Sequence, residues 1–157
     1  MVKEPTFDLQ TAHHYFAVTC FNKTWDLMEK KDRTPQDDLA MLHTSLASLW
    51  HWTQRADCTA ENLSIGYWQV SRVYALLKQA QNAKWYGELT LQAAQGVDVP
   101  PFCLGYAHEA LARAAMVAGE AATMNEQLTL ARNVLERMTD EEARKMLQAD
   151  LETINEV

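Results

Sequence analysis

Residues 65–119 read IGYWQVSRVYALLKQAQNAKWYGELTLQAAQGVDVPPFCLGYAHEALARAAMVAG. In each half of this stretch, apolar side chains recur at three- and four-residue steps, which is the spacing of one helix face. The first set is Tyr67, Val70, Tyr74 and Leu77, and the second is Tyr106, Leu111, Ala114, Ala115 and Ala118. Each helix closes at a short turn before a second helix, so the stretch predicts two consecutive helical hairpins. This pattern indicates a scaffold and specifies no activity.

The length and composition favour one all-α domain over residues 1–157. A chain of this size can bury a sizeable core without metal or disulfide bonds. The sequence has only 5 Gly and 4 Pro, and 48% of its residues are hydrophobic, which argues against disorder and against a turn-rich β fold. Neither a domain boundary nor a low-complexity linker is expected.

The net charge of −7 argues against nucleic acid as a partner, because such binding depends on clustered Lys and Arg. The one cluster, Lys30, Lys31 and Arg33, stands at a predicted helix end, where it complements the helix dipole. No apolar run reaches the length of about 18 residues that a membrane span needs. The N-terminus, with Glu4 and Asp8, lacks the pattern of a signal peptide. We therefore expect a cytoplasmic protein without membrane contact.

The three cysteines, Cys20, Cys58 and Cys103, are an odd number without CxxC spacing. This argues against a disulfide framework and against a cysteine-based zinc site. We expect small, buried or half-buried apolar residues.

Seven helices are expected in chain order. The first runs over residues 7–31, and the second begins at the start signal Thr34, Pro35 and Asp37. The third extends from a cap at Thr59 to about residue 77, and the fourth ends near residue 95. The fifth begins at the Pro100–Pro101 pair and ends at Gly119. The sixth precedes a capping box over residues 139–142, and the seventh, over 140–155, covers one apolar edge.

The second of these helices carries the most regular apolar stripe in the chain. Its members are Leu39, Leu42, Leu46, Leu49 and Thr53. We expect this stripe to pack on a neighbouring helix. His51 lies on the side opposite Leu42 and is expected to point away from that contact.

The two central hairpins resemble tetratricopeptide repeats, whose units are two packed helices with spaced Trp, Leu, Gly, Tyr, Ala and Phe positions. The matching residues are Tyr67, Val70, Ser71, Tyr74 and Ala83 in the first unit, and Leu111, Ala112, Gly119, Leu128 and Ala131 in the second. The two registers differ by 41 residues, from Tyr74 to Ala115. Departures include Gly87 at a large aromatic position and Met124 at a small one. The resemblance implies a right-handed α-α superhelix of three hairpins plus a C-terminal capping helix.

The whole chain is also similar to a bacterial family of helical-repeat proteins. The phrases that carry this similarity are Phe21-Asn-Lys-Thr-Trp25, His51-Trp52, Ser71-Arg-Val-Tyr74 and Glu109-Ala-Leu-Ala-Arg113. This similarity implies the fold and brings no activity with it.

In tetratricopeptide-like stacks the first helix of each hairpin lines a concave face where peptides bind. Carried onto this chain, the resemblance implies binding positions at Trp68, Gln69, Arg72, Glu109 and Arg113, with Asn22 and Trp25 on the first helix as further members. Indole surface, guanidinium groups and amides together suit a peptide or a small anionic ligand.

The same residues also have structural interpretations. Glu109 and Arg113 form an i, i+4 pair in the favourable order, and such a pair needs no ligand. Trp68 and Arg72 are also four residues apart, so the guanidinium could lie on the indole. Arg72 could equally reach Glu109 as an ion pair between helices.

Metal-dependent catalysis is the second class of hypothesis, because His13, His14, His51 and the pair His108–Glu109 stand on three predicted helices. No helical i, i+3 or i, i+4 ligand pair occurs among them, and neighbouring residues diverge by about 100°. Nucleophile elbows and Gly-rich phosphate loops are absent from the sequence. We therefore expect no catalytic residue, no metal and no cofactor.

Five tryptophans are many for this length, and an exposed Trp52 or Trp68 would mark a contact surface. Self-association into a homodimer is one way to cover such a surface. Our overall interpretation is a non-enzymatic protein- or peptide-binding module that uses the concave face. The alternative is a small-ligand sensor or a metal-dependent enzyme that uses the same face.

Overall fold

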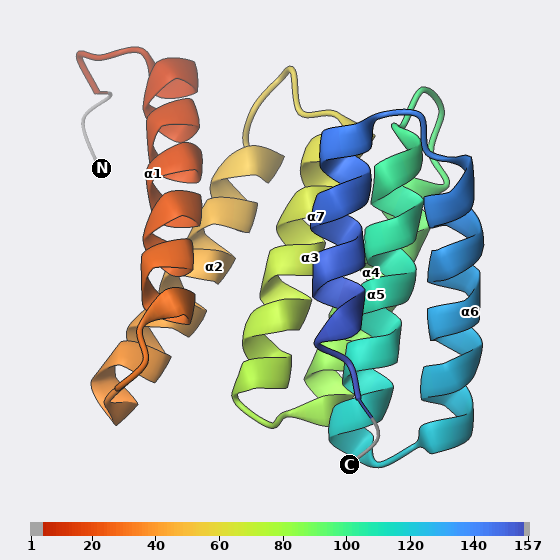
Figure 1. Cartoon of the computed structure of the whole chain (residues 1–157). Helices are drawn as coiled ribbons and strands as arrows, with labels where there is room; N and C mark the ends of the chain where they lie inside the picture. Colours follow the sequence, from red (N-terminus) through yellow and green to blue (C-terminus); the bar gives the residue numbers. More distant parts are fainter. Residues whose placement is uncertain (1–4, 156–157) are drawn as a thin grey trace. The chain divides into compact units, whose positions relative to one another are not determined.

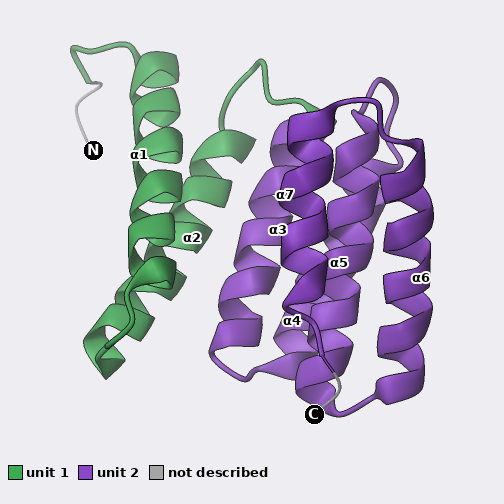
Figure 2. Ribbon diagram, in the orientation of Figure 1, with its two compact units in different colours: residues 1–59 green, residues 60–157 purple. Residues whose placement is uncertain are grey.

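The computed structural model describes residues 5–155, and within them the chain forms seven α-helices and no strand (Figure 1). The all-α prediction and the order of the seven helices are confirmed. The helices are α1 (Leu9–Glu29), α2 (Pro35–Thr53), α3 (Ala60–Leu76), α4 (Ala80–Ala94), α5 (Pro101–Ala118), α6 (Ala121–Arg137) and α7 (Glu141–Glu152). They belong to two compact units, Met1–Thr59 and Ala60–Val157, which are described separately (Figure 2).

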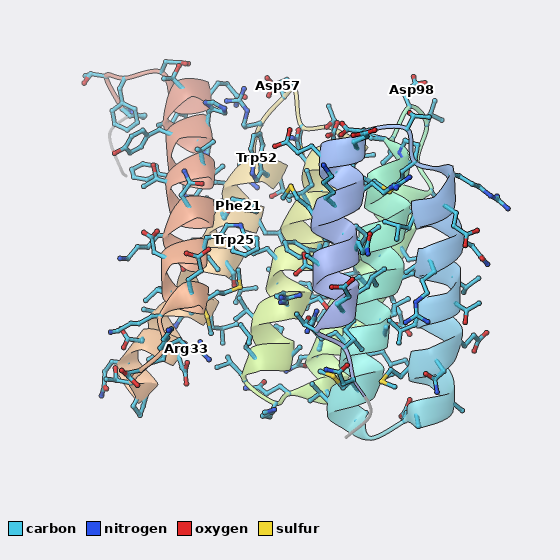
Figure 3. The ribbon with its side chains drawn as sticks, viewed as in Figure 1. Phe21, Trp25, Arg33, Trp52, Asp57 and Asp98 are labelled. Atoms are coloured by element: carbon cyan, nitrogen blue, oxygen red, sulfur yellow. The ribbon has the colours of Figure 1, made fainter. Side chains whose placement is uncertain are left out.

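Unit 1 is the antiparallel hairpin of α1 and α2. Asp8 caps α1 by accepting from the backbone N–H of Thr11, and Thr34 and Asp37 form the expected capping box at the start of α2. Arg33, at the turn between the helices, donates to Asp38 over 2.8 Å (Figure 3). These contacts fix both helix starts and the turn that joins them.

The predicted packing stripe of α2 is wrong at its two ends, while Leu49 is buried and Leu42 and Leu46 are half-buried. Leu39 is 54% exposed and Thr53 is exposed, whereas the buried residues of α2 are Met41, Ser45, Ser48 and Leu49. The Ser48 hydroxyl donates to the Ala17 carbonyl of α1 over 2.8 Å. Small hydroxyl side chains therefore lie in the contact with α1, because they permit close approach and satisfy their own polar groups.

Unit 2 contains two similar hairpins, α3–α4 and α5–α6, followed by α7. The first helices begin at Ala60 and Pro101 and the second helices at Ala80 and Ala121, so both pairs are offset by the 41 residues that the sequence predicted. The turn residues Lys78 and Gly119 have the same offset, and both have positive φ angles, of 60° and 74°. An equivalent backbone hydrogen bond follows each of them.

Close packing of small residues holds these hairpins together. Ala83, Ala112 and Ala114 are buried, and a Cβ placed on Gly87 would come within 3.0 Å of the Leu111 side chain. Leu111 of α5 thus fills the space that a large aromatic side chain would need at position 87, which accounts for that departure from the repeat pattern.

The last helix starts differently from the prediction. Asp140, and not a capping box from Thr139, caps α7 by accepting from the N–H groups of Glu142 and Ala143. The helix packs on α5 and α6 and buries Leu147, Leu151 and the following Ile154 in the same cluster as Met124 and Leu128. It therefore covers an apolar surface of the second hairpin, as expected.

Candidate functional site

Of the residues predicted on α3 and α5, Trp68, Arg72, Glu109 and Arg113 come together in unit 2. Trp68, Gln69, Glu109 and Arg113 are buried and Arg72 is half-buried. We call the set Trp68, Arg72, Tyr106, Glu109 and Arg113 the α3–α5 face. Asn22 and Trp25 belong to α1 in unit 1, where Asn22 is exposed and the half-buried Trp25 contacts Phe21 edge-on (Figure 3).

The carboxylate of Glu109 is at the centre of this face and is 0% exposed. It accepts from Trp68 Nε1 at 2.8 Å, from Arg72 Nη1 at 2.8 Å and from Arg113 Nε at 2.7 Å. These charge-assisted hydrogen bonds compensate for the loss of water around a buried carboxylate. Both ion pairs of Glu109 that the sequence suggested, with Arg72 and with Arg113, are present. The sequence also suggested the Trp68 indole as a surface for the Arg72 guanidinium, and in the structure its N–H donates to Glu109.

A second carboxylate reaches the face from α7. Asp150 accepts from Arg72 Nη2 and from the Tyr106 hydroxyl, each at 3.2 Å. Arg113 Nη2 donates to the Asp150 backbone carbonyl at 3.1 Å and to the Thr153 hydroxyl at 2.7 Å. Two guanidinium groups and a phenol therefore hold the C-terminal turn of α7, and a cation favours the negative end of a helix dipole.

Burial and charge keep the donors of this network in their donating forms. Burial, the charge of Asp150 and the hydrogen bond to it raise the pKa of Tyr106 well above its usual value, so the phenol stays protonated. Burial lowers the pKa of Arg113, which Glu109 opposes, and a guanidinium remains charged throughout the ordinary pH range. The network thus pairs two cations with two anions.

A hollow at Gly105 completes the contact with α7. A Cβ at Gly105 would lie 2.5 Å from Leu147 Cδ2, and Leu147 is fully buried. The missing side chain on α5 therefore makes room for Leu147, and the polar contacts of Asp150 lie one helical turn further along α7.

The sequence reasoning missed Asp150 and Thr153 and treated Tyr106 only as an apolar residue. Asp150 lies in the last turn of α7, where a carboxylate is unfavourable for the helix dipole unless a cation neutralises it. The position of Asp150 was therefore the one sequence feature that indicated pairing with a cation from another helix. The identity of the partner, Arg72, is 78 residues away and has no signature in local spacing.

The histidines take part in separate contacts. His13 Nδ1 and His51 Nδ1 are 2.8 Å apart, so His51 lies in the contact between α2 and α1. His108 Nδ1 pairs with Gln127 at 2.9 Å, and His14 lies edge-on to Trp52. In residues 5–155, no group of three or more His, Cys, Asp or Glu is placed to hold a metal ion.

The cysteines and tryptophans divide between interior and surface. Cys103 is buried, which raises the pKa of its thiol to about 11, and Cys20 and Cys58 are half-buried, so their predicted burial is confirmed. The exposed tryptophans are Trp50 and Trp85, whereas Trp68 is buried and Trp52 half-buried. Trp52 and Trp68 are therefore not among the exposed tryptophans that would mark a contact surface.

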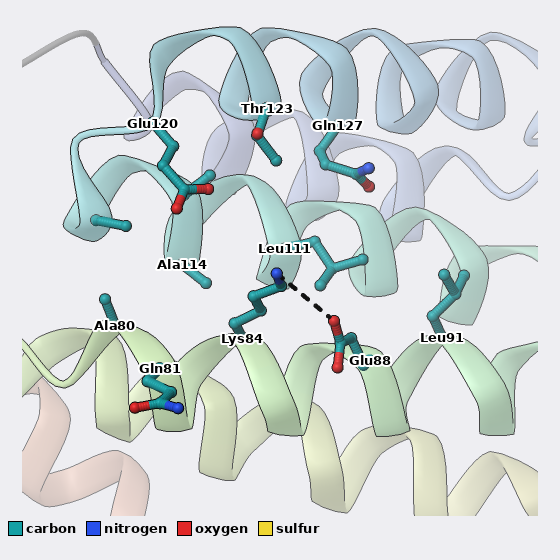
Figure 4. Close-up of a pocket in the computed structure, with 12 residues that line it drawn as sticks. Ala80, Gln81, Lys84, Glu88, Leu91, Leu111, Ala114, Glu120, Thr123 and Gln127 are labelled. Atoms are coloured by element: carbon teal, nitrogen blue, oxygen red, sulfur yellow. Dashed lines mark ion pairs between the residues drawn. The ribbon is translucent and has the colours of Figure 1, made fainter.

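A second surface feature in unit 2 is a groove of about 540 Å³ between α4, α5 and α6 (Figure 4). Its floor includes Leu111, Ala114 and Ala118, and an exposed Lys84–Glu88 ion pair of 3.9 Å lies along one side. The groove offers small apolar side chains and a weak surface ion pair, and it has no convergent set of donors comparable to that of the α3–α5 face.

Comparisons with models of protein families, with curated proteins and with solved structures found no match to this chain. None of the described helices combines the length and the apolar composition needed to cross a lipid bilayer.

Proposed function

We propose that the chain is a non-enzymatic protein-binding module whose α3–α5 face recognises an acidic peptide or helix. The observation that carries this proposal is the binding of α7 to that face. Arg72 and Tyr106 hold the Asp150 carboxylate, and Arg113 holds the last turn of the same helix. The contacts with α7 therefore indicate the ligand chemistry that the face accepts.

Charge supports an acidic ligand. Without Asp150, the face would contain the two cations Arg72 and Arg113 against the single anion Glu109, all with little access to water. Such a surface binds most favourably a ligand that supplies one carboxylate with good hydrogen-bond geometry. A helix with an acidic residue near its C-terminus and a leucine one turn earlier would reproduce the contacts of α7.

We infer further that the two hairpins of unit 2 are tetratricopeptide-like repeats. The constant 41-residue offset of their helix starts and turn residues supports this interpretation. The burial of Ala83, a small position of the repeat pattern, supports it as well. The cytoplasm is the compartment we propose, since the free thiols of Cys20, Cys58 and Cys103 suit a reducing environment.

A small-ligand sensor is the alternative use of the same face. Arg72 and Tyr106 would hold the carboxylate of a small molecule as they hold that of Asp150. The two uses differ in whether the hollow at Gly105 is filled by an apolar side chain of the ligand.

The proposal can be tested with the α7 sequence added as a separate peptide. In the full chain, the double variant Leu147→Ala/Asp150→Asn weakens the contacts of α7 with α3 and α5. It leaves every residue of α3 and α5 unchanged. Fluorescence anisotropy then measures its binding to a labelled peptide of residues 138–155. We expect saturable binding by this variant and at least tenfold weaker binding by the wild-type chain, in which α7 competes.

Two controls make the result specific. Adding Arg72→Met to the variant, or using a peptide with Asp150→Asn, should each weaken binding at least tenfold, because each removes one half of the same ion pair. If the variant is folded by circular dichroism and does not bind the peptide, the face is not a transferable receptor and the proposal fails.

Hydrogen exchange of the wild-type chain provides a second measurement that needs no variant. If the α3–α5 face can bind another helix in place of α7, then α7 must be able to detach from it while α5 stays folded. We therefore expect the amides of α7 to exchange at least tenfold faster than the most protected amides of α5. Equal protection would make α7 an inseparable part of the core and would also contradict the proposal.

A further inference from the structure

The α1–α2 hairpin has a long surface without fixed charge. Residues 9–22, in α1, and residues 39–54, in α2 and its C-cap Gln54, contain no Asp, Glu, Lys or Arg, although the chain has 21 acidic and 14 basic side chains. The two segments lie side by side, because His13 Nδ1 and His51 Nδ1 are 2.8 Å apart and Ser48 donates to the Ala17 carbonyl. The charge-free residues of the two helices therefore form one continuous region.

Large aromatic side chains project into solvent from this region and from Phe7, two residues before it. We call the set Phe7, Tyr15, Phe16 and Trp50 the aromatic face; its members are 62%, 62%, 46% and 54% exposed, respectively. Tyr15 packs edge-on against Phe16, and Phe16 packs against the His51 ring, which in turn contacts Trp50. The rings of Tyr15, Phe16, His51 and Trp50 thus form a contiguous cluster. Contiguous apolar patches mark contact surfaces more reliably than single exposed residues do.

The cluster borders a hollow of about 480 Å³. Phe7, Tyr15 and Phe16 line it together with Thr11, Ala12 and Asp8. Asp8 is the one charged residue among these six, and its carboxylate accepts from the backbone N–H of Thr11 in capping α1. A large apolar side chain from another molecule would fit such a space.

The outer side of α1 is uncovered to an unusual degree. Of its 21 residues, only Ala17, Thr24 and Leu27 are buried, and Leu9 and Val18 are exposed as well as the aromatic residues. A surface helix in a globular protein normally buries an apolar stripe along its whole length. The composition of α1 therefore indicates a further contact that the α1–α2 hairpin itself does not provide.

We propose that the aromatic face binds a second copy of this chain and forms a symmetric dimer. Each copy has a net charge of −7, so two copies repel wherever their acidic surfaces meet, but residues 9–22 and 39–54 bring no like charges together. Two such hairpins related by a twofold axis place four helices around one apolar centre. A strongly charged partner would find no complementary charge within these segments.

The test is sedimentation equilibrium of the full chain with matched charge insertions. Tyr15→Glu places a carboxylate in the aromatic face, and Trp85→Glu places one at an equally exposed position on α4, where Trp85 is 58% exposed. We expect a wild-type dimer, at least tenfold weaker dimerisation for Tyr15→Glu, and unchanged dimerisation for Trp85→Glu. Because both residues are exposed, circular dichroism should find both variants folded.

Dimerisation follows mass action, so it increases with protein concentration. A wild-type chain that stays monomeric at every concentration it can reach in the centrifuge would therefore overturn the proposal. A dimer that both variants weaken equally would also overturn it. Hydrogen exchange of the wild-type chain at low and high protein concentration checks the location of the dimer interface without any variant. Concentration-dependent protection should appear in residues 9–22 and be absent from residues 80–94, and the reverse pattern would contradict the proposal.

Discussion

The Glu109 carboxylate has no contact with water and accepts hydrogen bonds from Trp68, Arg72 and Arg113. Replacing it by Gln keeps the volume but removes the negative charge that compensates two guanidinium groups. We expect Glu109→Gln to lower the free energy of unfolding by about 3–5 kcal/mol, as breaking a buried ion pair does elsewhere. Urea denaturation followed by circular dichroism measures this loss.

The matched control for that substitution is Lys145→Ala, because Lys145 is an exposed residue of α7. It should change the free energy of unfolding by less than about 0.5 kcal/mol. A loss below about 1 kcal/mol for Glu109→Gln would mean that the network contributes little to the fold and that α7 is held by its apolar contacts.

The contact between His13 and His51 predicts a pH dependence in unit 1. Burial, together with the neighbouring His13, lowers the pKa of His51 below its ordinary value of 6.5. As the pH falls through 6.5, the unfolded chain therefore binds more protons at this residue than the folded chain, and the free energy of unfolding decreases. The loss ends below the folded-state pKa, where both states are protonated.

Denaturation at about pH 7.5 and about pH 5 checks this sign. His51→Gln should reduce the difference in unfolding free energy between the two pH values, and His43→Gln, at an exposed position of the same helix, should retain it. An unchanged pH dependence in the His51 variant would show that the His13–His51 contact does not control protonation.

At the scale of secondary-structure elements, the packing of α7 on α5 depends on the pair Gly105 and Leu147. A Cβ at position 105 would lie 2.5 Å from Leu147 Cδ2, so Gly105→Ala forces a buried side chain to move, at a cost of about 1–3 kcal/mol. In the background Leu147→Ala that obstruction is gone. The same substitution should then stabilise the chain by about 0.5–1 kcal/mol, because alanine is the better helix former.

Unfolding free energies of the wild type, both single variants and the double variant measure this change of sign. Equal effects of Gly105→Ala in both backgrounds would show that Leu147 does not occupy the hollow.

The helix boundaries were largely predictable because strong local signals mark them. Pro35 with its capping box, the proline at the start of α5 and the left-handed Gly119 each act within one turn of backbone. The helix contact inside unit 1 was not predictable in the same way. Counting apolar residues favoured Leu39, but the contact uses small side chains such as Ser48, whose burial depends on a hydrogen bond to the other helix.

At the scale of the whole molecule, part of the candidate site followed from the sequence. Spacing alone paired Glu109 with Arg113, and placing the two first helices of the hairpins side by side suggested Arg72 as a partner of Glu109. The role of α7 could not be read in this way. Its contact through Asp150 joins residues far apart in the chain, and only the packing of three helices brings them within hydrogen-bond distance.

The presence of α7 changes how the α3–α5 face must be interpreted. An open surface with two arginines would be a ready site for an anion, whereas here Asp150 already neutralises it. Any partner that uses the face must displace α7, so binding and the opening of α7 are coupled. The aromatic face of unit 1, in contrast, is exposed in the single chain.

The contact between Arg72 of α3 and Asp150 of α7 is the most direct point at which to test this account. A double-mutant cycle of Arg72→Met and Asp150→Asn measures its coupling free energy from four unfolding experiments. We predict a coupling of about 1–3 kcal/mol, because the pair is partly shielded from water and shares the network of Glu109. Additive effects, with a coupling below about 0.3 kcal/mol, would contradict the claim that this face holds α7 through its charged residues.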